Sequence, residues 1–199
     1  MSTCRVRIYV PVDSSNNYKT TANYPAQECR GHYDFQICKS QSIGTASSPE
    51  TFQSPIISYG HNALSEVAFF ESGRESTLYS GKRVRLFYWS FTASDTAITE
   101  LLKGLGGYLD GDNPDRDNTS AGKLVRYDVI KSPYNNYSVG RTNCFRAVAS
   151  WTNALGKSQL QTIYNNAHSS SGNGASDYYA YKLANSLSAY WTDKGIKSF

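Results

Sequence analysis

The chain has 199 residues, a formal net charge of +4 and 39% hydrophobic residues, enough for one domain with a buried core. Its basic residues are scattered apart from one short cluster at 82–85, so it lacks the basic stripe of a nucleic-acid-binding protein. No stretch has the length of a transmembrane helix, and the first residues lack the apolar run of a signal peptide. We therefore expect no membrane insertion and no cleaved leader.

Three short strands are expected in the first sixty residues. Residues 5–10 alternate polar and apolar side chains, and Pro11 ends this first strand. His32 opens the second strand, in which His32, Asp34 and Gln36 share one face and the apolar residues share the other, namely Tyr33, Phe35 and Ile37. Residues 56–59 form the third strand and lead into Gly60.

The middle of the chain continues this mixture of strands and helices. Residues 62–81 carry a weak signal, with an apolar patch at 67–70. Residues 82–91 alternate most strongly and predict the clearest strand. Thr92 or Ser94 is then expected to cap a helix with one apolar stripe, made of Ala97, Ile98, Leu101, Leu102 and Leu105. A further strand is expected at 124–130.

An acidic turn invites a calcium interpretation, because four aspartates crowd together at Asp110, Asp112, Asp115 and Asp117. An EF-hand loop that starts at Asp110 requires glycine at its sixth position and glutamate at its twelfth. The chain has Asp115 and Ala121 there. We expect an exposed turn and no bound metal.

The stretch around Cys144 predicts an amphipathic helix that begins with a cysteine. Asn143 is a natural N-cap, Gly156 a natural stop, and the apolar face repeats at helical spacing through Cys144, Val148, Trp151 and Leu155. A helix N-terminus stabilises a thiolate, which makes a cysteine nucleophilic. The alternative is a buried cysteine that only packs.

The segment after Gly156 is expected to be helical. Residues 158–167 begin with Ser158 as N-cap, and residues 176–191 place apolar and aromatic side chains at helical spacing. We therefore predict a single domain over 1–199, in which 157–199 is a helical C-terminal extension.

The three other cysteines leave the disulfide question open. Cys4, Cys29 and Cys38 fit no zinc-binding spacing, and at most one disulfide can form among them if Cys144 is a free thiol. Cys29 and Cys38 are too far apart for a disulfide if the run between them is fully extended. Pairing of Cys4 with either one, or reduction of all, stays open.

The order of these segments resembles a known enzyme family. A Gly-His pair opens a strand at His32, and after a long interval the pattern Tyr-x-x-Gly-x-x-Asn-Cys runs from Tyr137 to Cys144 and opens a helix. This order, with the Ser58-Tyr59-Gly60-His61 turn, is similar to the circularly permuted branch of the NlpC/P60 papain-like cysteine hydrolases, over residues 6–156. The resemblance implies an α+β papain-like fold, with the Cys144 helix against an antiparallel sheet whose strands contain His32, Ile56, Val84 and Leu124.

The same resemblance assigns roles to individual residues. Cys144 is the expected nucleophile and His32 the expected base. Ser58 or His61 would orient the imidazole, with Asp34 as a third option, because it shares the strand face of His32. Tyr137 would line the substrate site. No cofactor is expected.

The implied reaction is hydrolysis of an amide bond in bacterial peptidoglycan, through a thioester on Cys144. Family habit adds an antibacterial effector delivered by type VI secretion, cytoplasmic in the producer and active in the periplasm of a target cell. Its partners would be the peptidoglycan stem peptide, a secretion-apparatus carrier and an immunity protein. The alternatives are a thiol acyltransferase or protein-directed cysteine protease of the same fold, and a non-enzymatic module that binds glycan.

Overall fold

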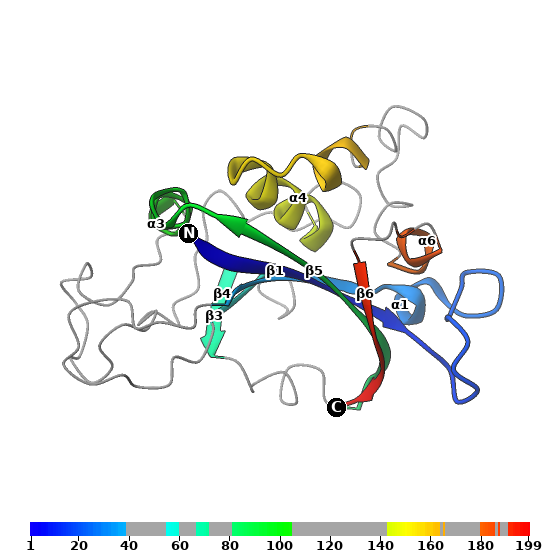
Figure 1. Ribbon diagram of the computed structural model, residues 1–199. Helices are drawn as coiled ribbons and strands as arrows, with labels where there is room; N and C mark the ends of the chain where they lie inside the picture. The colour runs from blue at the N-terminus through cyan, green and yellow to red at the C-terminus, as the bar shows by residue number, and fades with distance from the viewer. Residues whose placement is uncertain are drawn as a thin grey trace.

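A six-stranded antiparallel sheet forms the centre of the molecule (Figure 1). The computed structural model describes residues 1–38, 55–59, 67–71, 81–104, 143–163, 165, 180–185, 187 and 191–199. In chain order the strands are β1 (Ser2–Pro11), β2 (His32–Cys38), β3 (Pro55–Tyr59), β4 (Val67–Glu71), β5 (Arg83–Ala93) and β6 (Trp191–Ser198). Their order in the sheet is β4-β3-β2-β1-β5-β6, with β1 between β2 and β5.

Four helices accompany this sheet within the described residues: α1 (Ala26–Cys29), α3 (Asp95–Gly104), α4 (Cys144–Ala154) and α6 (Ala180–Ala184). Figure 1 shows α4 over one face of the sheet, α3 beside the start of β1, and α1 and α6 at the opposite end of the sheet. Residues 159–163 are also helical. The chain is therefore of the α+β class, as the sequence predicts.

The predicted strands of the first hundred residues are confirmed. The expected strands at 5–10, 56–59 and 82–91 correspond to β1, β3 and β5, and the one opened by His32 is β2. The weak apolar patch at 67–70 is β4. The expected strand at 124–130, which contains Leu124, and the acidic turn at 110–117 lie outside the described residues.

The face of the sheet under α4 is apolar, and we call it the helix face. In the pairing of β1 with its neighbours, Val6 lies opposite Phe35 and Trp89, and alternation places every second residue on the same face. The residues of this face are fully or almost fully buried: Val6, Ile8, Val10, Tyr33, Phe35, Ile37, Phe87 and Trp89. Phe145 of α4 packs on Tyr33, with ring centroids 5.0 Å apart. The apolar side of α4 and the helix face thus form one core.

The opposite face carries a buried ion pair, and we call it the polar face. Arg7 Nε donates to Asp34 Oδ1 (2.7 Å) and Arg7 Nη2 donates to Asp34 Oδ2 (2.8 Å). The two side chains are 2% and 0% exposed. His32 and Gln36 flank Asp34 on the same face and are also buried. The alternation that buries Phe35 under α4 therefore also buries a row of polar groups on the other side of β2.

Two predicted helix starts are confirmed. For the first of them, the structure decides between the two predicted N-cap residues. The backbone N–H of Ala97 donates to Ser94 Oγ (3.1 Å), so Ser94 is the N-cap of α3, whereas Thr92 belongs to β5. The N-cap of α4 is Asn143, and Gly156 follows the helix with a φ of 77°. This left-handed conformation is the one that favours glycine at a helix end.

The prediction of a helical C-terminal extension is wrong for its last part. Instead of one helix over 176–191, the structure has the short α6, and Trp191 opens β6, which pairs antiparallel with β5. Trp191 packs on Trp89 with ring centroids 5.7 Å apart, and Arg85 pairs with Asp193. The free edge of β5 offers backbone hydrogen bonds that outweigh the helical spacing of the side chains. The single-domain boundary itself stays a prediction.

Gly31, just before β2, allows α6 to approach the sheet closely. A Cβ atom built on Gly31 would lie 2.2 Å from Ala180 Cβ and 2.5 Å from the carbonyl oxygen of Tyr9. Gly31→Ala is therefore expected to lower the free energy of unfolding by about 1–3 kcal/mol, because both contacts force the backbone to shift. The double variant Gly31→Ala/Ala180→Gly should recover part of the loss, since it removes the first contact only. Urea denaturation measures both, and equal midpoints for Gly31→Ala and the wild type would contradict the prediction.

Candidate functional site

Cys144 is the first residue of α4, directly after its cap. Asn143 Oδ1 accepts a hydrogen bond from the backbone N–H of Arg146 (2.9 Å), and the Asn143 side chain is itself buried. Asn143 is thereby held as the cap that the sequence predicts. The remaining N–H groups of the first turn and the helix dipole favour negative charge at this end of the helix.

The thiol of Cys144 is fully buried. Its exposed fraction is 0%, and it belongs to the apolar core between α4 and the helix face, together with Phe145 and Val148. A substrate therefore reaches this thiol only if the groups that cover it move. This burial is also what a cysteine with a purely structural role shows.

His32, the histidine expected to serve Cys144, lies on the polar face. It is the first residue of β2, is 7% exposed, and pairs in register with Tyr9, whose ring centroid lies 6.1 Å from the imidazole centroid. Tyr33, the next residue, is the one that contacts α4. Because successive side chains leave a strand on opposite faces, His32 starts from the face of the sheet opposite to the one that α4 covers.

Asp34 and Ser58, two of the residues predicted to orient the imidazole, occupy paired positions in β2 and β3. Asp34 shares the face of His32, but both of its carboxylate oxygens accept hydrogen bonds from Arg7. Ser58 lies directly opposite Asp34 in the pairing of β2 with β3, so its position in the strand is on the polar face; its side chain lies outside the described part of the chain. Arg7 was not among the residues predicted for this site. The sequence signal for a buried Arg7 is its position between Val6 and Ile8, two apolar residues that are buried in the core.

His61 and Tyr137 lie outside the described residues. The position of His61 along the chain is still informative, because it follows β3, which ends at Tyr59, and precedes β4, which begins at Val67. The helix α4 contacts β3 as well as β2. The connection that contains His61 therefore starts from a strand that lies under the helix of Cys144.

Three of the four cysteines, Cys4, Cys29 and Cys144, form no disulfide. The predicted alternative of a disulfide from Cys4 to Cys29 or Cys38 is therefore not observed. The thiol of Cys29 donates weakly to the carbonyl oxygens of Pro25 (3.4 Å) and Tyr24 (3.6 Å). Burial raises the pKa of the Cys29 thiol, and the nearby Glu28 carboxylate raises it further. Cys29 is thus a poor nucleophile at neutral pH.

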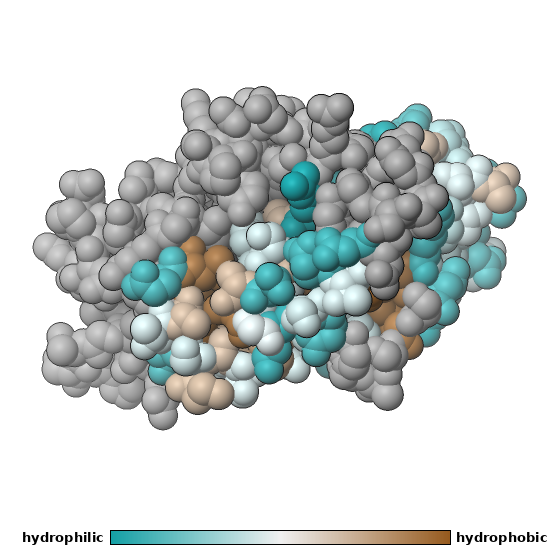
Figure 2. Space-filling model, turned by 90° about the horizontal axis from the view of Figure 1, so that it is seen from above, coloured by the Kyte–Doolittle hydropathy of each residue, from teal (hydrophilic) through white to brown (hydrophobic). Residues whose placement is uncertain are grey.

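The surface on the α4 side shows no broad apolar area among the described residues. Figure 2 shows hydrophilic and intermediate residues there, with small areas of apolar ones between them. Met1 is the exposed large hydrophobic residue of the described part. No described helix has both the length and the apolar character that a membrane crossing requires.

No cluster of three or more potential metal ligands occurs among the residues that the structure describes. Comparisons of the chain with models of protein families, with curated proteins and with solved structures find no match.

Proposed function

We propose that the chain is a papain-like cysteine hydrolase that cleaves amide bonds of bacterial peptidoglycan, with Cys144 as the nucleophile. The observation that carries this proposal is the position of Cys144 as the first residue of a helix capped by Asn143. Here the thiolate attacks the carbonyl carbon, and the N–H groups of the first turn stabilise the resulting oxyanion. The amine leaves with a proton, and water then hydrolyses the thioester.

The proposal takes its base from His61 instead of His32. The chain holds three histidines, and the polar face on which His32 lies is the one that α4 does not cover. His61 belongs to the connection that follows β3, a strand in contact with α4. His32 then has a structural role in the polar row beside Asp34.

The proposed biological setting rests on the habit of the NlpC/P60 family, which residues 6–156 resemble in the order of their segments. We propose an antibacterial effector that cleaves stem peptides in the periplasm of a target cell, is carried there by a type VI apparatus, and is neutralised in the producer by an immunity protein. Expression directed to the periplasm should then be more toxic for the wild type than for Cys144→Ala.

A second candidate is a binding module without catalysis. It is favoured by the complete burial of Cys144 within an apolar cluster, which is the environment of a packing cysteine. In that case the chain recognises its ligand elsewhere and Cys144 contributes only to stability.

Thiol reactivity separates the two candidates, and Cys29 is the internal control. Iodoacetamide at neutral pH should modify Cys144 faster than Cys29 in the native protein, because a helix start favours a thiolate, whereas burial raises the pKa of the Cys29 thiol. Peptide mass spectrometry gives the rate at each cysteine. His61→Ala should slow the reaction of Cys144 more than His32→Ala does. Equal, slow modification of both cysteines would favour the binding module.

A further inference from the structure

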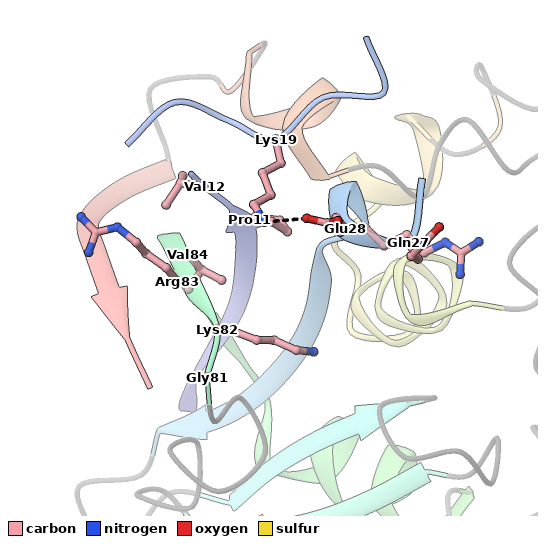
Figure 3. A pocket seen from close by; sticks show the side chains of 10 residues that line it. Pro11, Val12, Lys19, Gln27, Glu28, Gly81, Lys82, Arg83 and Val84 are labelled. Carbon is pink, nitrogen blue, oxygen red and sulfur yellow. Dashed lines mark hydrogen bonds and ion pairs between the residues drawn. The ribbon is translucent and has the colours of Figure 1, made fainter. Parts of the chain in front are cut away.

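A pocket of about 350 Å³ opens at one end of the sheet, between α1 and the adjoining ends of β1 and β5 (Figure 3). It is lined by Pro11, Val12, Lys19, Gln27, Glu28, Arg30, Gly81, Lys82, Arg83 and Val84. The volume falls within the usual range of small-molecule sites, near its lower end. None of the lining residues belongs to the catalytic candidates.

The lining is strongly basic, with four cationic residues against one carboxylate. Lys19 Nζ forms an ion pair with Glu28 Oε2 (2.9 Å), so the one carboxylate among the described residues of the lining is already neutralised. Arg83 donates to Asn16 Oδ1 and to Ser198 Oγ. Figure 3 shows its guanidinium turned away from the pocket.

Two cations of the lining remain available to a ligand. Arg30 and Lys82 are exposed, and neither forms an ion pair with any residue of the described ranges. Figure 3 shows Lys82 extending from the start of β5 across the opening, toward the side on which α1 lies. Among the apolar residues of the lining, Val12 and Val84 are almost fully buried, whereas Pro11 is half-buried and reaches the surface.

We propose that this pocket binds a small organic anion, whose carboxylate or phosphate group pairs with Lys82 and Arg30. Charge-assisted hydrogen bonds from an ammonium and a guanidinium suit both anions. The half-buried ring of Pro11 receives the uncharged part of the ligand. A pocket of this volume accommodates a ligand of dipeptide size.

Calorimetric titration with three probes tests the proposal and identifies the anion. The probes are N-acetylalanylalanine, its C-terminal amide and inorganic phosphate, titrated into the Cys144→Ala protein so that hydrolysis does not interfere. We expect saturable binding of the dipeptide acid or of phosphate, and none of the amide. Tighter binding of the dipeptide acid would identify a carboxylate ligand, and tighter binding of phosphate a phosphorylated one.

Charge-removing variants then locate the bound anion. Lys82→Gln and Arg30→Gln should each weaken binding about tenfold, as expected for the loss of one charge-assisted hydrogen bond. Lys197→Gln, which removes an exposed charge on β6 outside the lining, should bind as the parent does. All three variants replace exposed side chains, and equal melting temperatures without ligand would confirm that their folds are intact.

Two results would overturn the proposal. One is the absence of saturable binding of both anions at millimolar concentration. The other is unchanged affinity in the double variant Lys82→Gln/Arg30→Gln. Because the titrations use protein without the Cys144 thiol, either result leaves the proposed hydrolase activity untouched, and a failure of that activity does not affect the titrations.

Discussion

Cys144→Ala is expected to abolish the release of stem-peptide fragments from purified peptidoglycan, with a loss of rate of at least about 10³-fold. The thiolate forms the covalent intermediate, and the methyl group of alanine cannot replace it. Mass spectrometry of the soluble products measures the loss. It also identifies the amide bond that the wild type cleaves.

Cys29→Ala is the matched control for this experiment. It removes a buried thiol with a raised pKa, at the last residue of α1 and outside the core cluster that contains Cys144, and it should leave the rate close to that of the wild type. An active Cys144→Ala protein would contradict the nucleophile assignment. An inactive wild type whose Cys144 resists alkylation would leave the binding module as the function.

Comparison of the histidine variants in the same assay tests the choice of base. Loss of a general base lowers a rate by about 10²–10⁴-fold, and we expect this for His61→Ala. His32→Ala should lose less, because its imidazole extends from the face opposite Cys144. A larger loss in His32→Ala at unchanged stability would restore His32 as the base.

Asp34→Ala is expected to lower the free energy of unfolding by about 3–5 kcal/mol. The carboxylate accepts both hydrogen bonds from Arg7, and its removal leaves a guanidinium that is 2% exposed without this counter-ion. Urea denaturation measures the loss, and circular dichroism establishes whether the variant folds. A loss below about 1 kcal/mol would contradict this account of the polar face.

Two further variants show that burial is the cause of this effect. Arg7→Met/Asp34→Leu replaces the pair by apolar groups and should be markedly more stable than Asp34→Ala, because no buried charge remains. The pair of Arg85 with Asp193 serves as the exposed comparison, since its side chains are 40% and 39% exposed. Breaking it with Arg85→Met should cost less than about 1 kcal/mol.

Local patterns predicted the strands and the helix ends well, because each depends on a few neighbouring residues. Strict alternation located β2 and β5, and the cap residues Ser94 and Asn143 and the terminal Gly156 follow from backbone groups that every helix leaves unpaired. The strand β6 could not be found in this way. Trp191 continues a helical spacing, and its strand conformation depends on pairing with β5, which is distant in the sequence.

The assignment of His32 to Cys144 stays a prediction that rests on the order of the segments, and the alternation in β2 argues against it. Alternation in β2 already separated His32 from the apolar side chains Tyr33 and Phe35. An amphipathic helix packs its apolar side on the apolar face of a sheet, so a helix that begins with Cys144 belongs with Tyr33. The pocket between α1 and β5 was not predictable, because its walls come from three separate parts of the chain.

The central position of β1 has a consequence for how fast the chain folds. Val6 pairs with Phe35 on one side and with Trp89 on the other, so the middle of the sheet joins segments that are far apart in sequence. Closing such long loops costs entropy before any burial compensates for it, and sheets of this kind fold in milliseconds to seconds. We expect the β1–β2 pair to form first and β5 to pair with β1 in a later step. During that interval the apolar side of β1 is exposed, and refolding yield should fall as protein concentration rises.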